Sequence, residues 1–183
     1  DATGGRLIGG GWSASGVSID TRTLEPGDLF VALKDQRDGH DFAQAAIDKG
    51  AAACLVSRED ACDGPRLLVA DVQAALEALG AAARERSPAL RVGVTGSVGK
   101  TTVKDALGQV FSAAGAAHWS VKSYNNHWGV PLTLSRLPRA SERAVFEMGM
   151  NHAGEISRLT AQVRPRIAAI TAIAPAHLEN LGS

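Results

Sequence analysis

The sequence predicts an α/β protein with two domains, a small N-terminal α/β domain and a P-loop domain built on a parallel sheet. Two observations lead to this class. Short apolar segments of strand character alternate with segments of helical periodicity along most of the chain, which is typical of sheets covered by helices. In the second half, an apolar segment at 91–95 is followed by a glycine-containing loop and a helical pattern. Strand, loop and helix in this order form phosphate-binding sites in α/β proteins.

The first region of the chain contains several short strand candidates and two helical segments. The strand candidates are 7–8, 17–19, 29–33, 53–56 and 67–69. A helix is predicted over 40–49, because Asp41 lies near its start and Gly50 follows its end. A second helix follows Asp71, whose carboxylate can accept hydrogen bonds from the first free N–H groups of the helix.

The two domains are predicted to meet near residue 88. Pro88 disfavours helical geometry at Ser87, so the second helix cannot easily continue past that residue. We therefore place the boundary at 86–90 and the domains at 1–87 and 88–183.

The second region shows a regular alternation of strands and helices. Strands are predicted at 91–95, 144–148 and 167–173, helices at 100–114 and 154–163, and an apolar stretch at 130–137. Such alternation indicates a parallel sheet with ligands at the carboxyl ends of its strands. Nucleotide-binding domains of this class usually contain more strands, so we expect the second domain to be incomplete in this chain.

Composition excludes several classes of protein. The chain has 183 residues, 45% of them hydrophobic, which is enough for one large core or two small ones. Its 19 basic and 19 acidic side chains balance, which argues against a nucleic-acid partner or an anionic membrane surface. No apolar run approaches the ~18 residues of a membrane helix, and the N-terminus lacks the pattern of a signal segment. Cys54 and Cys62 match no metal or redox spacing, so we expect reduced thiols in a cytoplasmic protein.

The loop after residue 95 carries the reduced phosphate-binding pattern Gly-x-x-Gly-Lys-Thr. Lys100 would reach the β- and γ-phosphates of a nucleotide, and the Thr101 hydroxyl would bind Mg²⁺. Val94 stands where the common Walker pattern has a further glycine. The alternative is an ordinary strand-turn-helix with a solvated lysine. The expected nucleotide-binding residues are Thr95, Gly96, Ser97, Val98, Gly99, Lys100, Thr101 and Thr102.

Carboxylate and imidazole groups follow two later strands of the predicted sheet. Glu147 follows an apolar run, where a Mg²⁺ ligand belongs in a phosphate-binding sheet; the alternative is a solvated glutamate at a strand end. Asn151 and Glu155 could orient the metal or its waters, or Asn151 could cap the next helix. His177 could bind a second metal ion or contact a phosphoryl group, or be a structural histidine.

Two further polar stretches could bind ligands. Residues 123–131 combine asparagines with aromatic side chains, as do loops that bind sugars or peptides. The alternative is turn chemistry with a proline at a helix start. Residues 18–22 offer hydroxyls, a carboxylate and a guanidinium that could bind a nucleotide base or a diphosphate. Asp20 and Arg22 could equally pair with each other on the surface.

Together these motifs resemble the Mur ligase family, the ATP-dependent enzymes that build the peptide stem of bacterial peptidoglycan. The N-terminal substrate domain shared by the two later ligases is similar to segments 18–22, 26–33 and 38–42. Segment 95–102 is similar to the ATP loop of the family, which normally lacks the extra Walker glycine. Segments 125–134 and 147–156 are most similar to the member that adds D-alanyl-D-alanine. The relative that adds lysine or diaminopimelate usually has Thr-Thr-Pro in place of the double asparagine.

The resemblance implies a ligase that uses ATP and Mg²⁺. The terminal carboxylate of UDP-N-acetylmuramoyl-tripeptide would become an acyl phosphate, which the amine of D-alanyl-D-alanine attacks before phosphate leaves. Lys100, Glu147 and His177 would be catalytic. Thr101 and Glu147 would hold one Mg²⁺, and His177 a second metal ion or its waters. Ser18, Asp20, Thr21 and Arg22 would lie near the UDP end of the substrate, and Asn125 and Asn126 near the muramoyl-peptide path.

Parts of the family pattern are missing from the chain. The family has a carbamoylated lysine soon after the His177 motif, then an adenine-binding segment and a third domain. We therefore expect the chain alone to be inactive, and the whole protein to be a cytoplasmic monomer without nucleic-acid or membrane partners. The alternatives are a lysine- or diaminopimelate-adding member and a non-catalytic nucleotide-binding module. Folylpolyglutamate synthase shares the loop but lacks a domain like 1–86.

Overall fold

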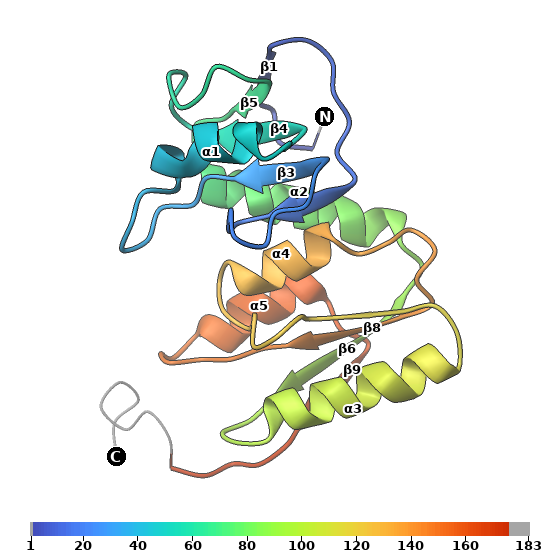
Figure 1. Cartoon of the computed structure of the whole chain (residues 1–183). Coiled ribbons are helices and arrows are strands. Elements are labelled where there is room, and N and C mark those ends of the chain that lie inside the picture. Colours follow the sequence, from blue (N-terminus) through green and yellow to red (C-terminus); the bar gives the residue numbers. More distant parts are fainter. Residues whose placement is uncertain (1, 176–183) are drawn as a thin grey trace. The chain divides into compact units, whose positions relative to one another are not determined.

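The computed structural model describes residues 2–175 and divides into two compact units, Asp1–Leu79 and Gly80–Ser183 (Figure 1). The division falls inside helix α2 (Val72–Arg86), earlier than the predicted boundary at 86–90. The prediction placed the boundary at the end of a helix, whereas the two units divide in the middle of α2.

Packing explains where the division lies. From Gly80 onward, α2 lies against helix α4 (Gly129–Ser135), and a Cβ added at Gly80 would be 3.1 Å from the Leu134 Cβ. The last turns of α2 therefore belong to the second unit. The start of α2 confirms the predicted cap, because Asp71 Oδ1 accepts the Ala74 N–H at 3.0 Å.

The first unit is built on a five-stranded sheet within its described residues, in the order β1-β5-β4-β3-β2. The strands are β1 (Arg6–Ile8), β2 (Gly16–Ser18), β3 (Asp28–Val31), β4 (Ala53–Val56) and β5 (Arg66–Leu68). β1 is antiparallel to β5, and the other pairs are parallel. All the strands predicted for this region are confirmed, with small shifts at their ends, and the central strands β3 and β4 are buried.

The helix predicted at 40–49 forms two consecutive pieces, a 3₁₀ turn η1 (Gly39–Phe42) and helix α1 (Ala43–Asp48). Asp38 caps the turn, because its carboxylate accepts the His40 N–H at 3.0 Å. The side chain of His40 is buried under this turn.

The second unit is built on a parallel sheet of four strands in its described part, in the order β7-β8-β6-β9. The strands are β6 (Leu90–Thr95), β7 (Ala117–Trp119), β8 (Arg143–Glu147) and β9 (Ile167–Ile170). The predicted parallel sheet is confirmed. Prediction missed β7, because three residues at a sheet edge carry no periodic signal. The strand predicted at 167–173 ends early, because the chain then bonds to the loop after β6, where Ser97 N–H donates to the Ala172 carbonyl at 2.9 Å.

Helices cover both faces of this sheet (Figure 1). Helix α3 (Lys100–Ala113) packs on one face through Val103, Leu107 and Phe111. Helices α4 and α5 (Glu155–Val163) pack on the other face around Phe146. The predicted apolar stretch at 130–137 forms most of α4, whose residues are all buried. Within the described residues, no helix is long and apolar enough to cross a membrane.

Candidate functional site

The loop between β6 and α3 requires glycine at two positions. Gly96 and Gly99 have φ angles of +132° and +85°, a region that residues with a Cβ rarely adopt. Gly96 is also crowded, because an added Cβ would collide with the Thr171 hydroxyl. Thr95 ends β6, and its carbonyl accepts the Thr171 N–H at 2.9 Å. Both glycines are therefore needed by the backbone, as the sequence indicates.

Residues that follow β9 brace this loop. Ser97 donates its N–H to the Ala172 carbonyl and its hydroxyl to the Ala174 carbonyl, at 2.9 and 2.8 Å. The Thr171 hydroxyl donates to the Val98 carbonyl at 2.6 Å. Prediction did not find this bracing, because it assigned Thr171 and Ala172 to a strand.

The first residues of α3 lie beside the loop. The Lys100 ammonium donates to the Gly96 carbonyl at 2.7 Å, so it lies across the loop and is half-buried. The Thr101 hydroxyl lies 3.4 Å from the Ser123 hydroxyl. Thr102 is exposed at the start of the helix. The helix N-terminus and the ammonium together favour an anion at this point.

Glu147 ends β8 in the strand next to the loop. It pairs in register with Val94 of β6, and its side chain is only 1% exposed. One carboxylate oxygen, Oε1, accepts a hydrogen bond from Asn125 Nδ2 at 2.7 Å. The other, Oε2, is buried and has no hydrogen-bond partner among the described residues. The alternative of a solvated glutamate is wrong, and a buried carboxylate oxygen without a partner fits a cation ligand.

The two asparagines have different contacts. Asn125 orients the Glu147 carboxylate, and its carbonyl accepts the Gly149 N–H at 2.8 Å. Asn126 Oδ1 accepts the Gly129 N–H at 2.8 Å and so closes the first turn of α4. The Asn126 side chain therefore has the turn-forming role that the sequence offered as the alternative to ligand binding. The contact between Asn125 and Glu147 was missed, because it joins residues in different elements.

Asn151 and Glu155 form a local turn before α5. The Glu155 carboxylate accepts the N–H groups of Asn151 and His152 at 2.6 and 3.1 Å. The backbone hydrogen bond from Asn151, which has the larger effect, and the one from His152 lower the pKa of Glu155. Gly154 occupies the cap position, so the alternative in which the Asn151 side chain caps α5 is wrong.

Few metal-binding groups converge in the described part of the second unit. No cluster of three or more His, Cys, Asp or Glu side chains with metal-site geometry occurs among the described residues. Beside the loop, the Glu147 carboxylate and the Thr101 hydroxyl offer oxygen donors of the type that Mg²⁺ prefers. His177, the predicted ligand of a second metal ion, lies outside the described residues.

In the first unit, the polar residues at 18–22 form hydrogen bonds with one another and with Lys49. Three hydrogen bonds join the Arg22 guanidinium to the Asp20 carboxylate. Nε donates to Oδ1 and Oδ2 at 3.0 and 3.1 Å, and Nη2 donates to Oδ2 at 2.7 Å. The buried Ser18 hydroxyl donates to the Asp20 carbonyl, and the Thr21 carbonyl accepts from the Lys49 ammonium. The ion pair between Asp20 and Arg22, which the sequence left open as an alternative to ligand binding, is present.

Comparison with known proteins identifies the family. Residues 13–127 match the model of the Mur ligase family, catalytic domain, and residues 94–183 match that of the Mur ligase middle domain. The chain belongs to the Mur ligase family. It is 44% identical over 184 residues to the UDP-N-acetylmuramoyl-tripeptide–D-alanyl-D-alanine ligase of Escherichia coli (strain K12), covering 100% of this chain and 41% of that protein. The chain thus spans about two-fifths of the length of this relative.

Solved structures agree with this assignment. The Acinetobacter baumannii UDP-N-acetylmuramoylalanyl-D-glutamyl-2,6-diaminopimelate–D-alanyl-D-alanyl ligase matches with a TM-score of 0.85 and 34% identity, over 97% of this chain and 41% of that one. The MurF ligase of Thermotoga maritima, solved in complex with ADP, matches with a TM-score of 0.71 and 30% identity, over 89% and 38%. In this Mur ligase chain, Val94 is fully buried in β6, so the position of the Walker glycine is part of the core.

Proposed function

We propose that this chain is part of an ATP-dependent ligase that adds D-alanyl-D-alanine to UDP-N-acetylmuramoyl-tripeptide. The observation that carries the reaction class is Glu147, a buried carboxylate with one unpartnered oxygen in the strand beside the phosphate loop. The choice of substrates is supported by the names of the relatives, which are 31–44% identical to this chain. The T. maritima neighbour was solved in complex with ADP, which supports a nucleotide ligand for this chain.

In this proposal, the phosphate loop and the residues around it hold Mg²⁺ and ATP. Lys100 and the N-terminus of α3 bind the phosphates, and Thr101 and Glu147 hold Mg²⁺, with His177 near a second metal ion or its waters. When bound, Mg²⁺ would neutralise charge on the phosphoryl group as it is transferred. The tripeptide carboxylate takes the γ-phosphoryl group of ATP and ADP is released. The amine of D-alanyl-D-alanine then attacks the acyl phosphate, loses a proton and displaces inorganic phosphate. Asn125 keeps the Glu147 carboxylate oriented.

The first unit would bind the UDP end of the substrate through Ser18, Asp20, Thr21 and Arg22. The Arg22 side chain is 86% exposed, so its guanidinium is accessible to a diphosphate. Asn125 and Asn126 would lie near the muramoyl-peptide path. A cytoplasmic monomer without nucleic-acid or membrane partners completes the proposal, in keeping with the balanced charge of the chain.

Amine-dependent phosphate release by the full-length protein that contains this chain tests the proposal. With ATP, Mg²⁺ and the UDP-linked tripeptide, we expect phosphate release with D-alanyl-D-alanine and none with lysine or diaminopimelate. Release with lysine or diaminopimelate, using the UDP-linked dipeptide as acceptor, would instead support the other Mur ligase. ATP binding without release under either condition would exclude both ligases and support a nucleotide-binding module.

The Lys100→Ala variant tests the role of the loop. Removing the ammonium that balances phosphate charge should lower phosphate release by roughly a hundredfold or more. The exposed Lys34 of the first unit provides the matched control, since Lys34→Ala should retain turnover. Unchanged turnover of Lys100→Ala would contradict the assignment of this loop.

A further inference from the structure

Helix α3 buries a lysine that the proposed chemistry does not use. Lys104 lies one turn after Lys100 and is 0% exposed. Its ammonium donates to the carbonyls of Ser120 and Lys122, both at 2.9 Å, and lies 2.8 Å from Asp105 Oδ1. These three contacts match the three N–H donors of an ammonium group. Buried lysines are rare, because removing the charge from water is costly, so this one calls for an explanation.

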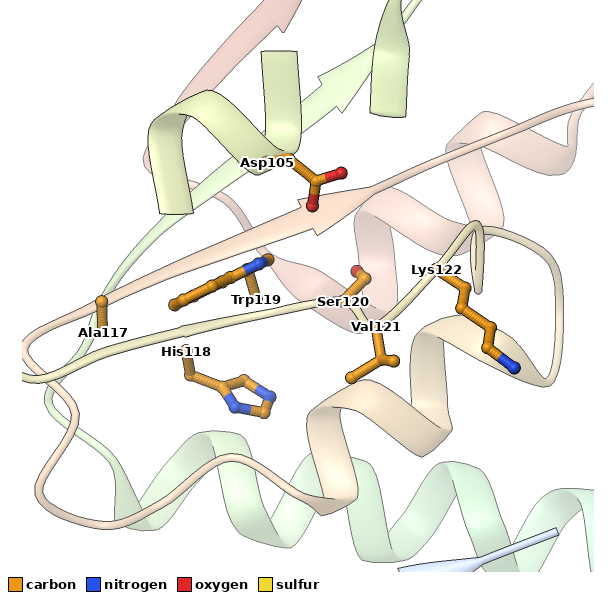
Figure 2. Close-up of a pocket in the computed structure, with 7 residues that line it drawn as sticks. All are labelled: Asp105, Ala117, His118, Trp119, Ser120, Val121 and Lys122. Atoms are coloured by element: carbon orange, nitrogen blue, oxygen red, sulfur yellow. The ribbon is translucent and has the colours of Figure 1, made fainter. Parts of the chain in front are cut away.

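Lys104 lies on the stripe of α3 that faces β7 and the chain beyond it. Gly108, one turn later, is the other buried residue assigned to this helix, and it lies against the Trp119 ring. Figure 2 shows the chain that follows this strand, with Ser120 and Lys122 beyond Trp119 and Asp105 on the neighbouring helix. An open pocket is lined by residues 117–122 and by Asp105. On the side of α3, hydrogen bonds from the Lys104 ammonium to the carbonyls of Ser120 and Lys122 hold the segment.

The backbone of the segment adopts an uncommon conformation. Lys122 has a φ of +54°, one of two positive values at non-glycine residues in the described chain. An L-residue in this region is strained and persists where its surroundings hold it there. The carbonyl of Lys122 is one of the two acceptors of the Lys104 ammonium. Lys104 thus stabilises the turn that directs the chain toward the site.

The same segment, residues 120–125, contacts both proposed Mg²⁺ ligands. The Ser120 hydroxyl accepts the Glu147 N–H at 3.3 Å, and Asn125 Nδ2 donates to Glu147 Oε1 at 2.7 Å. Between them, the Ser123 hydroxyl lies 3.4 Å from the Thr101 hydroxyl. A shift of the segment would therefore move the partners of Glu147 and Thr101 together.

We propose that Lys104 is a positioning residue, whose ammonium fixes residues 120–125 so that Asn125 and Ser123 orient the side chains of Glu147 and Thr101. The link to Mg²⁺ rests on the proposed function, whereas the control of the segment does not. Groups that orient metal ligands typically change metal affinity by about 10–100-fold when they are removed.

Hydrogen exchange of the full-length protein without nucleotide tests control of the segment. In Lys104→Met, the amides of 120–126 should exchange at least about tenfold faster, while those of α5 stay within twofold of the wild type. Asp105→Asn, which keeps the ammonium and both carbonyl contacts, is the matched control and should leave the segment unchanged. If Lys104→Met does not fold by circular dichroism, Lys104→Ala, which also removes the N–H donors to both carbonyls, takes its place. Unchanged exchange in the segment overturns the inference.

A double-mutant cycle on nucleotide binding tests the path through Asn125. Lys104→Met should raise the Mg²⁺ concentration needed for half-maximal ATP binding about tenfold. In an Asn125→Ala background the same change should add no more than about threefold, because one of the two contacts that Lys104 controls, from Asn125 to Glu147, is already lost. If the two substitutions raise this Mg²⁺ concentration by independent factors that multiply in the double variant, Lys104 has a merely structural role and the inference is overturned. A wild type that binds ATP but releases no phosphate contradicts the proposed ligase and leaves this cycle intact. If the wild type binds no ATP, the exchange experiment alone decides.

Discussion

Glu147 is the residue on which the proposed chemistry of the second unit depends most. A carboxylate that is almost fully buried, with one oxygen bound to Asn125 and the other without a partner, is expensive for a fold to keep. Its cost is understandable if a cation is bound there for part of the reaction cycle. The sequence indicated a carboxylate at this strand end, whereas its burial and its amide partner come from the folded chain.

Exchanging that carboxylate for an amide separates function from stability. Glu147→Gln should lower phosphate release by the full-length protein about a hundredfold or more, because the ligand charge is lost. Thermal stability without metal should stay equal or rise, because a buried unpaired charge has been removed. Glu155→Gln, whose carboxylate binds its own turn, is the control and should retain most turnover. Retained activity together with lower stability would show that Glu147 is structural.

His40 stabilises the first unit through both ring nitrogens. Nδ1 lies 2.6 Å from Asp38 Oδ1, and Nε2 accepts the Ser57 N–H at 2.9 Å. The ring is buried, so these contacts join the turn at Asp38 to the chain after β4 with little access to water. Sequence patterns give no sign of this link, because the partners lie far apart along the chain.

Removing this ring should loosen the first unit. His40→Ala should lower the free energy of unfolding by ~2–3 kcal/mol, since buried groups lose their partners and a cavity remains. Denaturant unfolding of the full-length protein, followed by hydrogen exchange in β3 and β4, measures the loss. Asp41→Ala breaks an exposed contact with Arg58 and should cost at most ~0.5 kcal/mol. Equal effects of the two variants would contradict the role of His40.

At the scale of elements, close packing of α3 on β7 depends on a glycine. An added Cβ at Gly108 would collide with the Trp119 ring. Gly108→Ala should therefore lower stability by ~1–3 kcal/mol through overpacking, although alanine favours helices. Gln109→Ala, at an exposed position of the same helix, should be neutral or slightly stabilising. Thermal unfolding compares the two, and a stabilised Gly108→Ala would contradict this packing.

The order of the elements was largely predictable, and their ends were less so. The strands β4 and β6 and the helix α3 follow the expected segments closely, because apolar periodicity and glycine are local signals. The strand predicted at 167–173 is shorter because residues 171–174 bond to the phosphate loop. Competition between a sheet and a loop for the same backbone groups cannot be read from a local pattern.

At the scale of the whole molecule, the chain corresponds to about two-fifths of its E. coli relative. We predict that the 183-residue chain alone releases no phosphate with any amine, while the full-length protein does. The reason is that the family resemblance implies further groups for this reaction, a carbamoylated lysine, an adenine-binding segment and a third domain, which this chain does not include. The phosphate-release assay, run on both proteins at equal concentration, checks this. Amine-dependent release by the chain alone would contradict it.

The sequence by itself determined the α/β class, the parallel sheet, the glycine requirement of the phosphate loop and the placement of a carboxylate beside it. Each depends on signals within a few residues, namely periodicity, loop glycines and strand ends. Only the tertiary structure decided that α2 crosses the boundary, that Asn125 binds Glu147 and that Lys104 holds residues 120 and 122. These contacts join residues 16–22 positions apart, in different elements, and their energy depends on burial that arises only when the sheet and its helices pack.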